Sequence, residues 1–312
     1  MVKTVKYIKF IALTIFMLIT LLFFVSRLIV WQTERTYPPL GNFIMVEDVQ
    51  LHYVRDGSGN PVVMLHGRDG TLHEYTLTIF NRLAGSYDAI AFDRPGYGYS
   101  QWGNEEHLTT EGQAYLINQA LKKLDLEKPL IIGHSYGGAV ALQYLLDYPD
   151  QVKGAVLISG VAYIDEIEGG SILNIPNIPL VGPVLTNTLI PIGGRFASGI
   201  YEQAFWPAEP NETYVDTMLA LYSRPAQFTA TARELSFMYE SVNAISPRYK
   251  EINVPVSIIF GTSDQLLNFK IDGIALDKAM PNSSLVLIED GGHKIHHTHQ
   301  EAVLTVIDQM HN

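Results

Sequence analysis

The sequence predicts an α/β fold in which a mostly parallel sheet of about eight strands has helices on both faces, with a helical insertion and an N-terminal transmembrane helix. Two observations lead to this prediction. Apolar β-rich runs alternate with helical patterns from residue 43 onward, which is typical of a parallel sheet covered on both faces. The length of 312 residues and the apolar content of 47% provide a substantial core.

Charge and cysteine content exclude several classes of function. The chain has 32 acidic and 21 basic residues, a formal charge of -11, which repels phosphate backbones, so nucleic acid is not an expected partner. The chain contains no cysteine. Disulfides, thiolate nucleophiles and cysteine-ligated metals are therefore excluded.

Residues 10–31 are predicted to form a transmembrane anchor. Residues 10–25 contain no charge, glycine or proline. At a rise of ~1.5 Å per residue, residues 10–31 span about 33 Å, enough for the ~30 Å hydrocarbon core of a bilayer. Residues 32–42 are predicted to form a short stalk.

Basic residues on one side of the anchor predict its orientation. Lys3, Lys6 and Lys9 precede the apolar run, so residues 1–9 are expected in the cytoplasm and the rest of the chain outside. No small-x-small cleavage site follows, which favours a single-pass anchor over a removed signal peptide. The remaining alternative is a buried or interfacial helix.

The predicted core comprises residues 43–160 and 254–312. Helices are expected over residues 109–124, 136–148 and 298–311, because apolar side chains recur there at helical spacing. The expected strands are residues 43–46, 49–54, 61–65, 88–92, 129–132, 154–158, 256–260 and 284–288.

Residues 161–253 interrupt this alternation and are predicted to form a cap. The segment is rich in Ile, Leu, Pro and aromatic residues, and residues 172–192 are low in charge and contain four prolines. A segment this long is most often functional, so we expect a lid over the site. An additional packing layer on the core is the alternative.

The first chemical signal is a Gly-x-Ser-x-Gly motif centred on Ser135. It lies between a β-run and a helical pattern, where a nucleophilic serine must project from a very tight turn. Gly133 and Gly137 leave room at positions where a Cβ would collide. The following helix begins at Tyr136, whose backbone N–H can donate to a developing oxyanion.

This arrangement resembles the nucleophile turn of the α/β-hydrolase superfamily, and two other motifs strengthen the resemblance. His66 and Gly67 follow a predicted strand, and in the superfamily the turn at this position supplies a second oxyanion donor, which falls here on the N–H of Arg68. Residues 93–100 are similar to the family's D-x-P-G-x-G-x-S loop. We expect Asp93 and His66 to be structural.

The acid and the base are expected late in the chain, in the order serine, acid, histidine. Asp264 follows a predicted strand in a G-x-x-D pattern, and His293 follows the last strand and two glycines. His293 would accept the serine proton while Asp264 orients the imidazole. Asp165 or Glu166 remain alternative acids.

A metal site and a cofactor site are not expected. His296, His297 and His299 crowd behind His293, but no acidic pattern typical of a hydrolytic metal site lies nearby in the sequence. The glycines around Ser135 lack the spacing and the lysine of nucleotide-binding loops.

The resemblance implies a serine esterase or lipase-like enzyme with a cap insertion, cleaving hydrophobic carboxylic esters through an acyl-enzyme on Ser135. The expected partners are a small ester, with a lipid among the candidates, and the membrane. Alternatives within the fold are carbon–carbon bond hydrolases and haloperoxidase-like proteins. From a different class comes a non-catalytic binding protein of the same fold.

Overall fold

The sheet of the computed structural model, which describes residues 2–165 and 172–311, has eight strands. Their order is β1-β2-β4-β3-β5-β6-β7-β8, and β1 and β2 run antiparallel to their neighbours whereas all other pairs are parallel. This confirms the predicted fold class. The strands are β1 (Asn42–Val46), β2 (Val49–Gly57), β3 (Pro61–Leu65), β4 (Asp88–Phe92), β5 (Leu130–His134), β6 (Gly154–Ile158), β7 (Val256–Gly261) and β8 (Ser283–Ile288).

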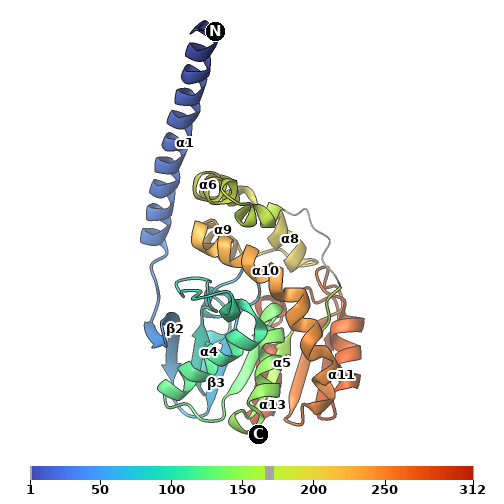
Figure 1. Cartoon of the computed structure of the whole chain (residues 1–312). Helices are drawn as coiled ribbons and strands as arrows, with labels where there is room; N and C mark the ends of the chain where they lie inside the picture. The colour runs from blue at the N-terminus through green and yellow to red at the C-terminus, as the bar shows by residue number, and fades with distance from the viewer. Residues whose placement is uncertain (1, 166–171, 312) are drawn as a thin grey trace.

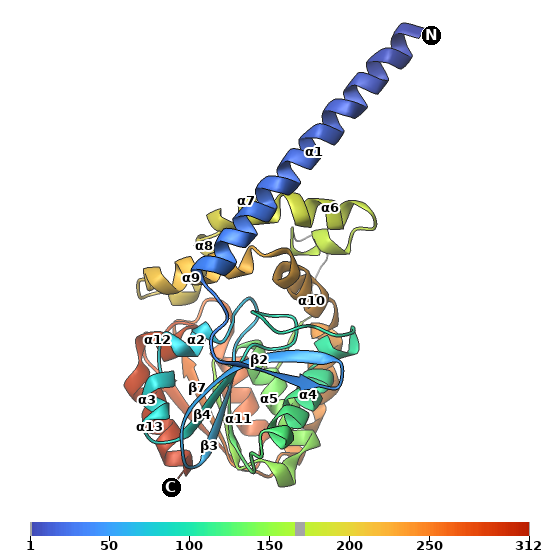
Figure 2. The ribbon, with the colours of Figure 1, turned by 90° about the vertical axis from the view of Figure 1, so that its left-hand side faces the viewer.

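Helices cover both faces of the sheet, as Figures 1 and 2 show. Alternate side chains of each strand point to opposite faces. In β3, Val63 and Leu65 pack with α4 and α5, whereas Val62 and Met64 pack with α3 and α13. The core helices are α2 (His73–Thr76), α3 (Phe80–Ala84), η1 (Glu106–Leu108), α4 (Thr110–Lys123), α5 (Tyr136–Asp147), η2 (Pro149–Gln151), η6 (Phe269–Ala275), α11 (Leu276–Ala279), α12 (Ile295–Thr298) and α13 (Gln300–His311).

The described residues between β6 and β7 form a helical layer above the carboxyl ends of the strands (Figure 1). We refer to residues 161–253 as the cap. Helix α10 descends from it onto the core beside α4 and α5. The helices of the cap are η3 (Ile172–Asn177), α6 (Val181–Thr188), α7 (Ile190–Gly193), η4 (Gly194–Phe196), α8 (Gly199–Phe205), α9 (Glu212–Tyr222), α10 (Pro225–Ile245) and η5 (Ser246–Glu251).

Helix α1 (Val2–Thr36) projects from the molecule as a single rod (Figure 2). It is long and apolar enough to cross a membrane. The helix continues through the first residues of the segment expected as a stalk, and residues 37–41 connect it to β1. Only the C-terminal third of α1 packs on the rest of the protein. Ser26, Val30 and Thr33 are buried in this part, where α1 contacts helices of the cap.

Candidate active site

Ser135 lies at a sharp turn between β5 and α5. Its backbone has φ 50° and ψ −123°, a conformation that L-residues rarely adopt and that often marks functional positions. A Cβ on Gly133 would approach the Gly137 carbonyl oxygen to 2.4 Å, and a Cβ on Gly137 would approach the Leu65 oxygen to 2.2 Å. A side chain at either glycine would therefore collide with the backbone of this turn. Ser135 itself stays partly accessible while the residues on both sides of it are buried.

Asp264 and His293 are brought together from the loops that follow β7 and β8. The His293 Nδ1 and the Asp264 Oδ2 lie 2.7 Å apart, and both side chains are almost completely buried. The second carboxylate oxygen of Asp264 accepts the N–H groups of Leu266 and Leu267 at 2.8 and 3.0 Å. The carboxylate is thereby fixed, and it leaves the Nε2 of His293 as the nitrogen available to another partner.

The turn at Ser135 and the loop that carries His293 are in direct contact. The ring of His134, the residue before Ser135, lies 4.7 Å from the ring of His293 between centroids. The His134 Nε2 and the His293 carbonyl oxygen are 3.2 Å apart. Ser135, Asp264 and His293, which are far apart in the sequence, therefore occupy one region above the carboxyl ends of β5, β7 and β8.

Two backbone N–H groups beside Ser135 have no acceptor within the described part of the chain. They belong to Arg68 and Tyr136, the two residues expected as oxyanion donors. Tyr136 begins α5, so its N–H is one of the unpaired donors of a helix N-terminus. The Arg68 loop lies close to the serine, because a Cβ on Gly67 would come within 2.9 Å of the Ser135 Cβ.

His66 buttresses this loop. Its Nδ1 lies 2.7 Å from the Gly67 oxygen, and its Nε2 accepts the N–H of Arg94 at 2.9 Å. Burial lowers its pKa to about 4, so the ring is neutral and both nitrogens are occupied. His66 thus has the structural position that we expected.

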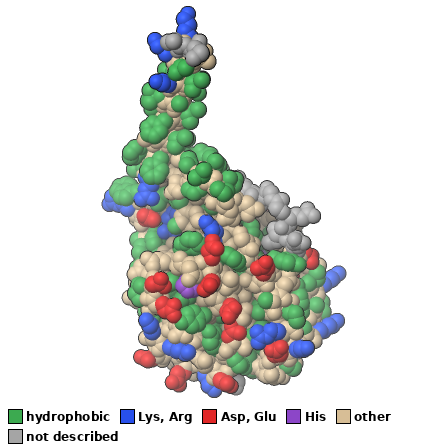
Figure 3. All heavy atoms as spheres, viewed as in Figure 1, with side chains coloured by type: hydrophobic (Ala, Val, Ile, Leu, Met, Phe, Trp, Pro, Cys, Tyr) green, Lys and Arg blue, Asp and Glu red, His purple; other side chains and the backbone are tan. Residues whose placement is uncertain are grey.

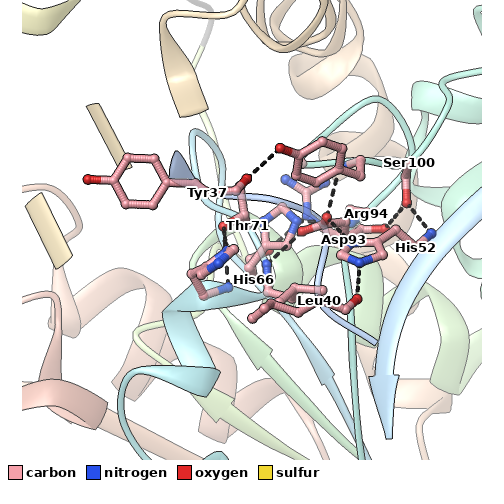
Figure 4. A network of polar contacts seen from close by, with 12 residues as sticks. Tyr37, Leu40, His52, His66, Thr71, Asp93, Arg94 and Ser100 are labelled. Carbon is pink, nitrogen blue, oxygen red and sulfur yellow. Dashed lines mark hydrogen bonds and ion pairs between the residues drawn. The ribbon is translucent and has the colours of Figure 1, made fainter. Parts of the chain in front are cut away.

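Asp93 organises the loop after β4, as Figure 4 shows. One carboxylate oxygen accepts the N–H of Leu72 at 2.7 Å, and the other accepts from the His52 Nδ1 at 2.6 Å and the Tyr99 N–H at 2.8 Å. His52 also contacts the carbonyl of Leu40, which belongs to the connection after α1. Asp93 therefore joins three segments of the chain, and both of its carboxylate oxygens are occupied by these contacts.

Arg94 ties the same loop to the cap. Its fully buried guanidinium donates to Glu234 of α10 at 2.5 Å, to Gln113 at 2.6 Å and to the Gly67 carbonyl at 3.2 Å. The Tyr97 hydroxyl donates to the same Glu234 at 2.5 Å. Burial opposes the charge on Arg94, but Glu234 raises the pKa of Arg94 above its usual value. Arg94 thus connects α10 of the cap to the loop that carries Arg68.

A second buried charged group lies beneath the nucleophile turn, and the sequence did not reveal it. Glu74 of α2 is fully buried and pairs with Lys294 at 3.0 Å. It also contacts His134 and, at 3.4 Å, His296. Burial alone would raise the pKa of Glu74, but His134 and the Lys294 ammonium hold it well below its usual range. The Glu74 carboxylate thereby links His134, which precedes Ser135, to Lys294, which follows His293.

This cluster has ligands of the kind that metal ions use. One atom each of Glu74, His134 and His296 lies within 4.8 Å of the others. The acid that the sequence pattern lacked is therefore supplied by a distant segment. The Lys294 ammonium already balances the Glu74 charge, however, and it would repel a divalent ion at this position. The donor set fits an ion pair better than a metal.

The other candidates for site residues lie elsewhere. Asp165 is exposed, and Glu166 lies outside the described residues. His297 packs against the aromatic rings of Phe205 and Tyr214. The His299 Nδ1 lies 2.9 Å from the hydroxyl of its neighbour, Thr298.

The cap touches the histidine loop directly. A Cβ on Gly292 would approach the Trp206 carbonyl oxygen to 2.1 Å. The Lys294 N–H donates to the Ala204 carbonyl at 3.2 Å. The end of α8 therefore lies on the loop that positions His293.

Comparison with known proteins agrees with this fold. The family model for the alpha/beta hydrolase fold matches residues 60–300. The 2-hydroxy-6-oxononadienedioate/2-hydroxy-6-oxononatrienedioate hydrolase 1 of Pseudomonas putida is 27% identical over 282 residues, which cover 84% of this chain and 93% of the relative.

Two solved structures show the same architecture. An esterase from Exiguobacterium antarcticum has a TM-score of 0.69 at 22% identity, over 88% of this chain and 100% of its own. A bacterial membrane phospholipase A has a TM-score of 0.67 at 18% identity, over 98% of this chain and 99% of its own. These structures share the fold with this chain, and the family model covers most of its length. The chain therefore belongs to the alpha/beta hydrolase fold family.

Proposed function

We propose that this protein is a serine hydrolase that cleaves hydrophobic carboxylic esters through an acyl-enzyme on Ser135. The observation that carries the proposal is the pairing of His293 with a fixed Asp264 beside a serine in a strained turn. Two unpaired N–H groups, of Arg68 and Tyr136, adjoin the same serine. An activated nucleophile, an oriented base and an oxyanion site are the parts that acyl transfer requires.

The first half of the reaction acylates Ser135. The Nε2 of His293 takes the hydroxyl proton while the serine oxygen bonds to the ester carbonyl carbon. The carbonyl oxygen becomes an oxyanion, which accepts the N–H groups of Arg68 and Tyr136. The carbon–oxygen bond to the alcohol then breaks, and the alcohol leaves with the proton from His293.

The second half releases the acid. His293 removes a proton from water as the water oxygen attacks the acyl carbonyl, and the same N–H groups receive the second oxyanion. The bond to Ser135 then breaks and the serine oxygen regains its proton from His293. Throughout, Asp264 stabilises the imidazolium and fixes the tautomer.

The relative from Pseudomonas putida favours a second candidate, cleavage of a carbon–carbon bond beside a carbonyl. The same serine, acid and histidine would serve this reaction. The apolar composition of the cap and the N-terminal helix favour the ester instead, because both suit a hydrophobic substrate close to a membrane. Ester turnover therefore distinguishes the two candidates.

The proposed function is tested by treating the full chain in detergent with a fluorophosphonate probe and locating the adduct by peptide mass spectrometry. Turnover of p-nitrophenyl esters from acetate to palmitate is measured in parallel. We expect an adduct on Ser135 and turnover, both lost in Ser135→Ala and both retained in Ser263→Ala, a matched change beside Asp264. An adduct without turnover of any ester favours the carbon–carbon substrate. A folded protein that forms no adduct contradicts a serine nucleophile and favours the binding-protein alternative.

We also propose that α1 is an uncleaved anchor with its N-terminus in the cytoplasm and the catalytic domain outside. Lys3, Lys6 and Lys9 before the apolar run support this orientation. Because the chain has no cysteine, Glu127→Cys provides a unique label on the core. A membrane-impermeant maleimide should label this variant in intact cells. Labelling only after lysis, or a mature chain that starts near residue 35, contradicts the proposal.

A further inference from the structure

The first half of the cap exposes a group of apolar side chains. The segment from η3 to α7 contains no charged residue, and its Leu180 is 89% exposed. Phe196, which follows this segment and Arg195 in η4, is 84% exposed. Exposed apolar patches of this kind usually mark an interaction surface. We call this group the cap patch; its members are Ile178, Leu180, Val181, Val184, Leu189, Phe196 and Ile200.

The cap patch lies beside the outer end of α1. The Ser26 hydroxyl donates to the Thr188 carbonyl of α6 at 2.6 Å, and Val30 is 5% exposed because α6 and α7 pack on this part of the helix. Both residues belong to the proposed span of residues 10–31. At ~1.5 Å per residue, Ser26 lies only about 7.5 Å along the helix axis from Trp31.

Because this contact joins α6 to α1, the depth of α1 in the membrane determines the depth of the cap. If residues 10–31 cross the bilayer, the end of α6 reaches the height of the outer leaflet boundary. Figure 3 shows apolar side chains that continue from α1 onto the adjoining part of the cap. Exposed apolar side chains at this depth can be buried at the boundary of headgroups and acyl chains, where binding strengthens with the apolar area that is buried.

An apolar cavity of about 310 Å³ lies inside the same part of the cap. Leu173, Leu185 and Leu189 line one side of it, and Tyr222 and Phe228 of α9 and α10 line the other. Gln227, the neighbour of Phe228 in α10, donates its side-chain N–H to the carbonyl of Gly70 at 3.3 Å, in the loop that carries Arg68. The cavity therefore shares Leu189 and Ile200 with the cap patch, and its wall on α10 adjoins the loop of the proposed oxyanion site.

We propose that the cap patch lies in the interface of the bilayer that α1 spans, and that the cavity behind it receives the acyl chain of a lipid from that bilayer. The second part of this proposal rests on the proposed ester hydrolysis. The occupant is a lipid surface because the side chains of the patch are apolar, continuous with the anchor helix and level with the outer leaflet boundary.

The depth of the patch is testable with single cysteines, since the chain has none of its own. Full-length Leu180→Cys and Phe196→Cys are labelled with a bimane dye and placed in phosphatidylcholine nanodiscs that contain brominated acyl chains. Glu127→Cys, in the loop before β5 at the opposite end of the core, is the control. We expect both cap probes to be quenched and the control to keep its emission.

Two outcomes overturn the bilayer contact. Cap probes quenched no more than the control show that the patch stays in water. Cross-linking of two Leu180→Cys chains without quenching shows that a second copy covers the patch. If the probes are quenched but no ester is hydrolysed, the bilayer contact holds and the lipid substrate is refuted.

The role of the patch in catalysis is tested with Leu180→Asp and Phe196→Asp combined, because a carboxylate is costly in an apolar interface. We expect turnover of a long-chain ester embedded in vesicles to fall about tenfold, equivalent to ~1.4 kcal/mol, and turnover of soluble p-nitrophenyl acetate to stay within about twofold. Met45→Asp, on the exposed face of β1, should change neither. An equal loss for both substrates contradicts a role in lipid access.

Discussion

The core and the outer part of the cap, from η3 to α7, differ in their charged residues. At the carboxyl ends of the core strands, Glu74 and Arg94 are fully buried and paired, whereas the cap from η3 to α7 has no charge. Buried pairs fix geometry because breaking one leaves an uncompensated charge. The core is therefore built to hold a few atoms in place, and the outer cap is built to present an adaptable apolar surface.

The largest loss of activity is expected at Asp264, the proposed catalytic acid. Asp264→Asn should keep the contact with His293 but remove the charge that stabilises the imidazolium, so kcat/KM should fall about 10,000-fold. Steady-state kinetics with a soluble ester measure the loss, and circular dichroism checks the fold. A loss below tenfold would indicate that another carboxylate is the acid.

A large loss of stability is expected at the buried cluster. Glu74→Gln leaves Lys294 without its partner and should lower the free energy of unfolding by about 4 kcal/mol. The folded pKa of Glu74 lies below its unfolded value of 4.5. Its stabilisation is therefore present above pH ~4.5 and disappears as the pH falls through the folded pKa.

Thermal unfolding of the wild type and Glu74→Gln between pH 3.5 and 7.5 tests both statements. The difference in Tm should be greatest near pH 7 and should shrink at the acid end. Glu301→Gln, which changes an exposed pair with Arg82, should leave Tm nearly unchanged at neutral pH. Equal Tm values for Glu74→Gln and wild type at pH 7 would mean that the cluster is not stabilising.

A smaller loss is expected where the cap is anchored. Glu234→Gln weakens the pair with Arg94, although Gln113 still accepts from the guanidinium, and should cost about 3 kcal/mol. Limited proteolysis should then cut the cap faster than the core. Glu105→Gln, which alters the exposed pair with the neighbouring Arg233, should cost less than about 1 kcal/mol. Uniform proteolysis of cap and core would show that this pair does not hold the cap.

The smallest effect is expected between α1 and the cap. Ser26→Ala removes one hydrogen bond to the Thr188 carbonyl and should cost about 1 kcal/mol, or about 2 °C in Tm. Thr20→Val is the matched control, since its hydroxyl bonds only within α1. Equal Tm values for the two variants in nanodiscs would indicate that the bilayer, rather than this contact, holds the cap against the helix.

The core strands and the three proposed triad residues could be predicted from the sequence because each follows a local pattern. Buried parallel strands read as short apolar runs, and Ser135 is bracketed by glycines that its turn requires. Asp264 and His293 each follow a strand, so their positions came from the order of elements along the chain. The buried partners had no such signal, because Glu74 lies 220 residues from Lys294 and Glu234 lies 140 residues from Arg94.

The sequence by itself determined the α/β class, the long apolar N-terminal helix and the motifs around Ser135, because each depends on residues that are close together in the chain. Only the tertiary structure decided that Glu74 neutralises Lys294, that α10 supports the Arg68 loop and that the uncharged part of the cap adjoins α1. These features depend on which distant segments meet. Burial is a property of the folded chain alone, and a buried cation needs a carboxylate as its partner.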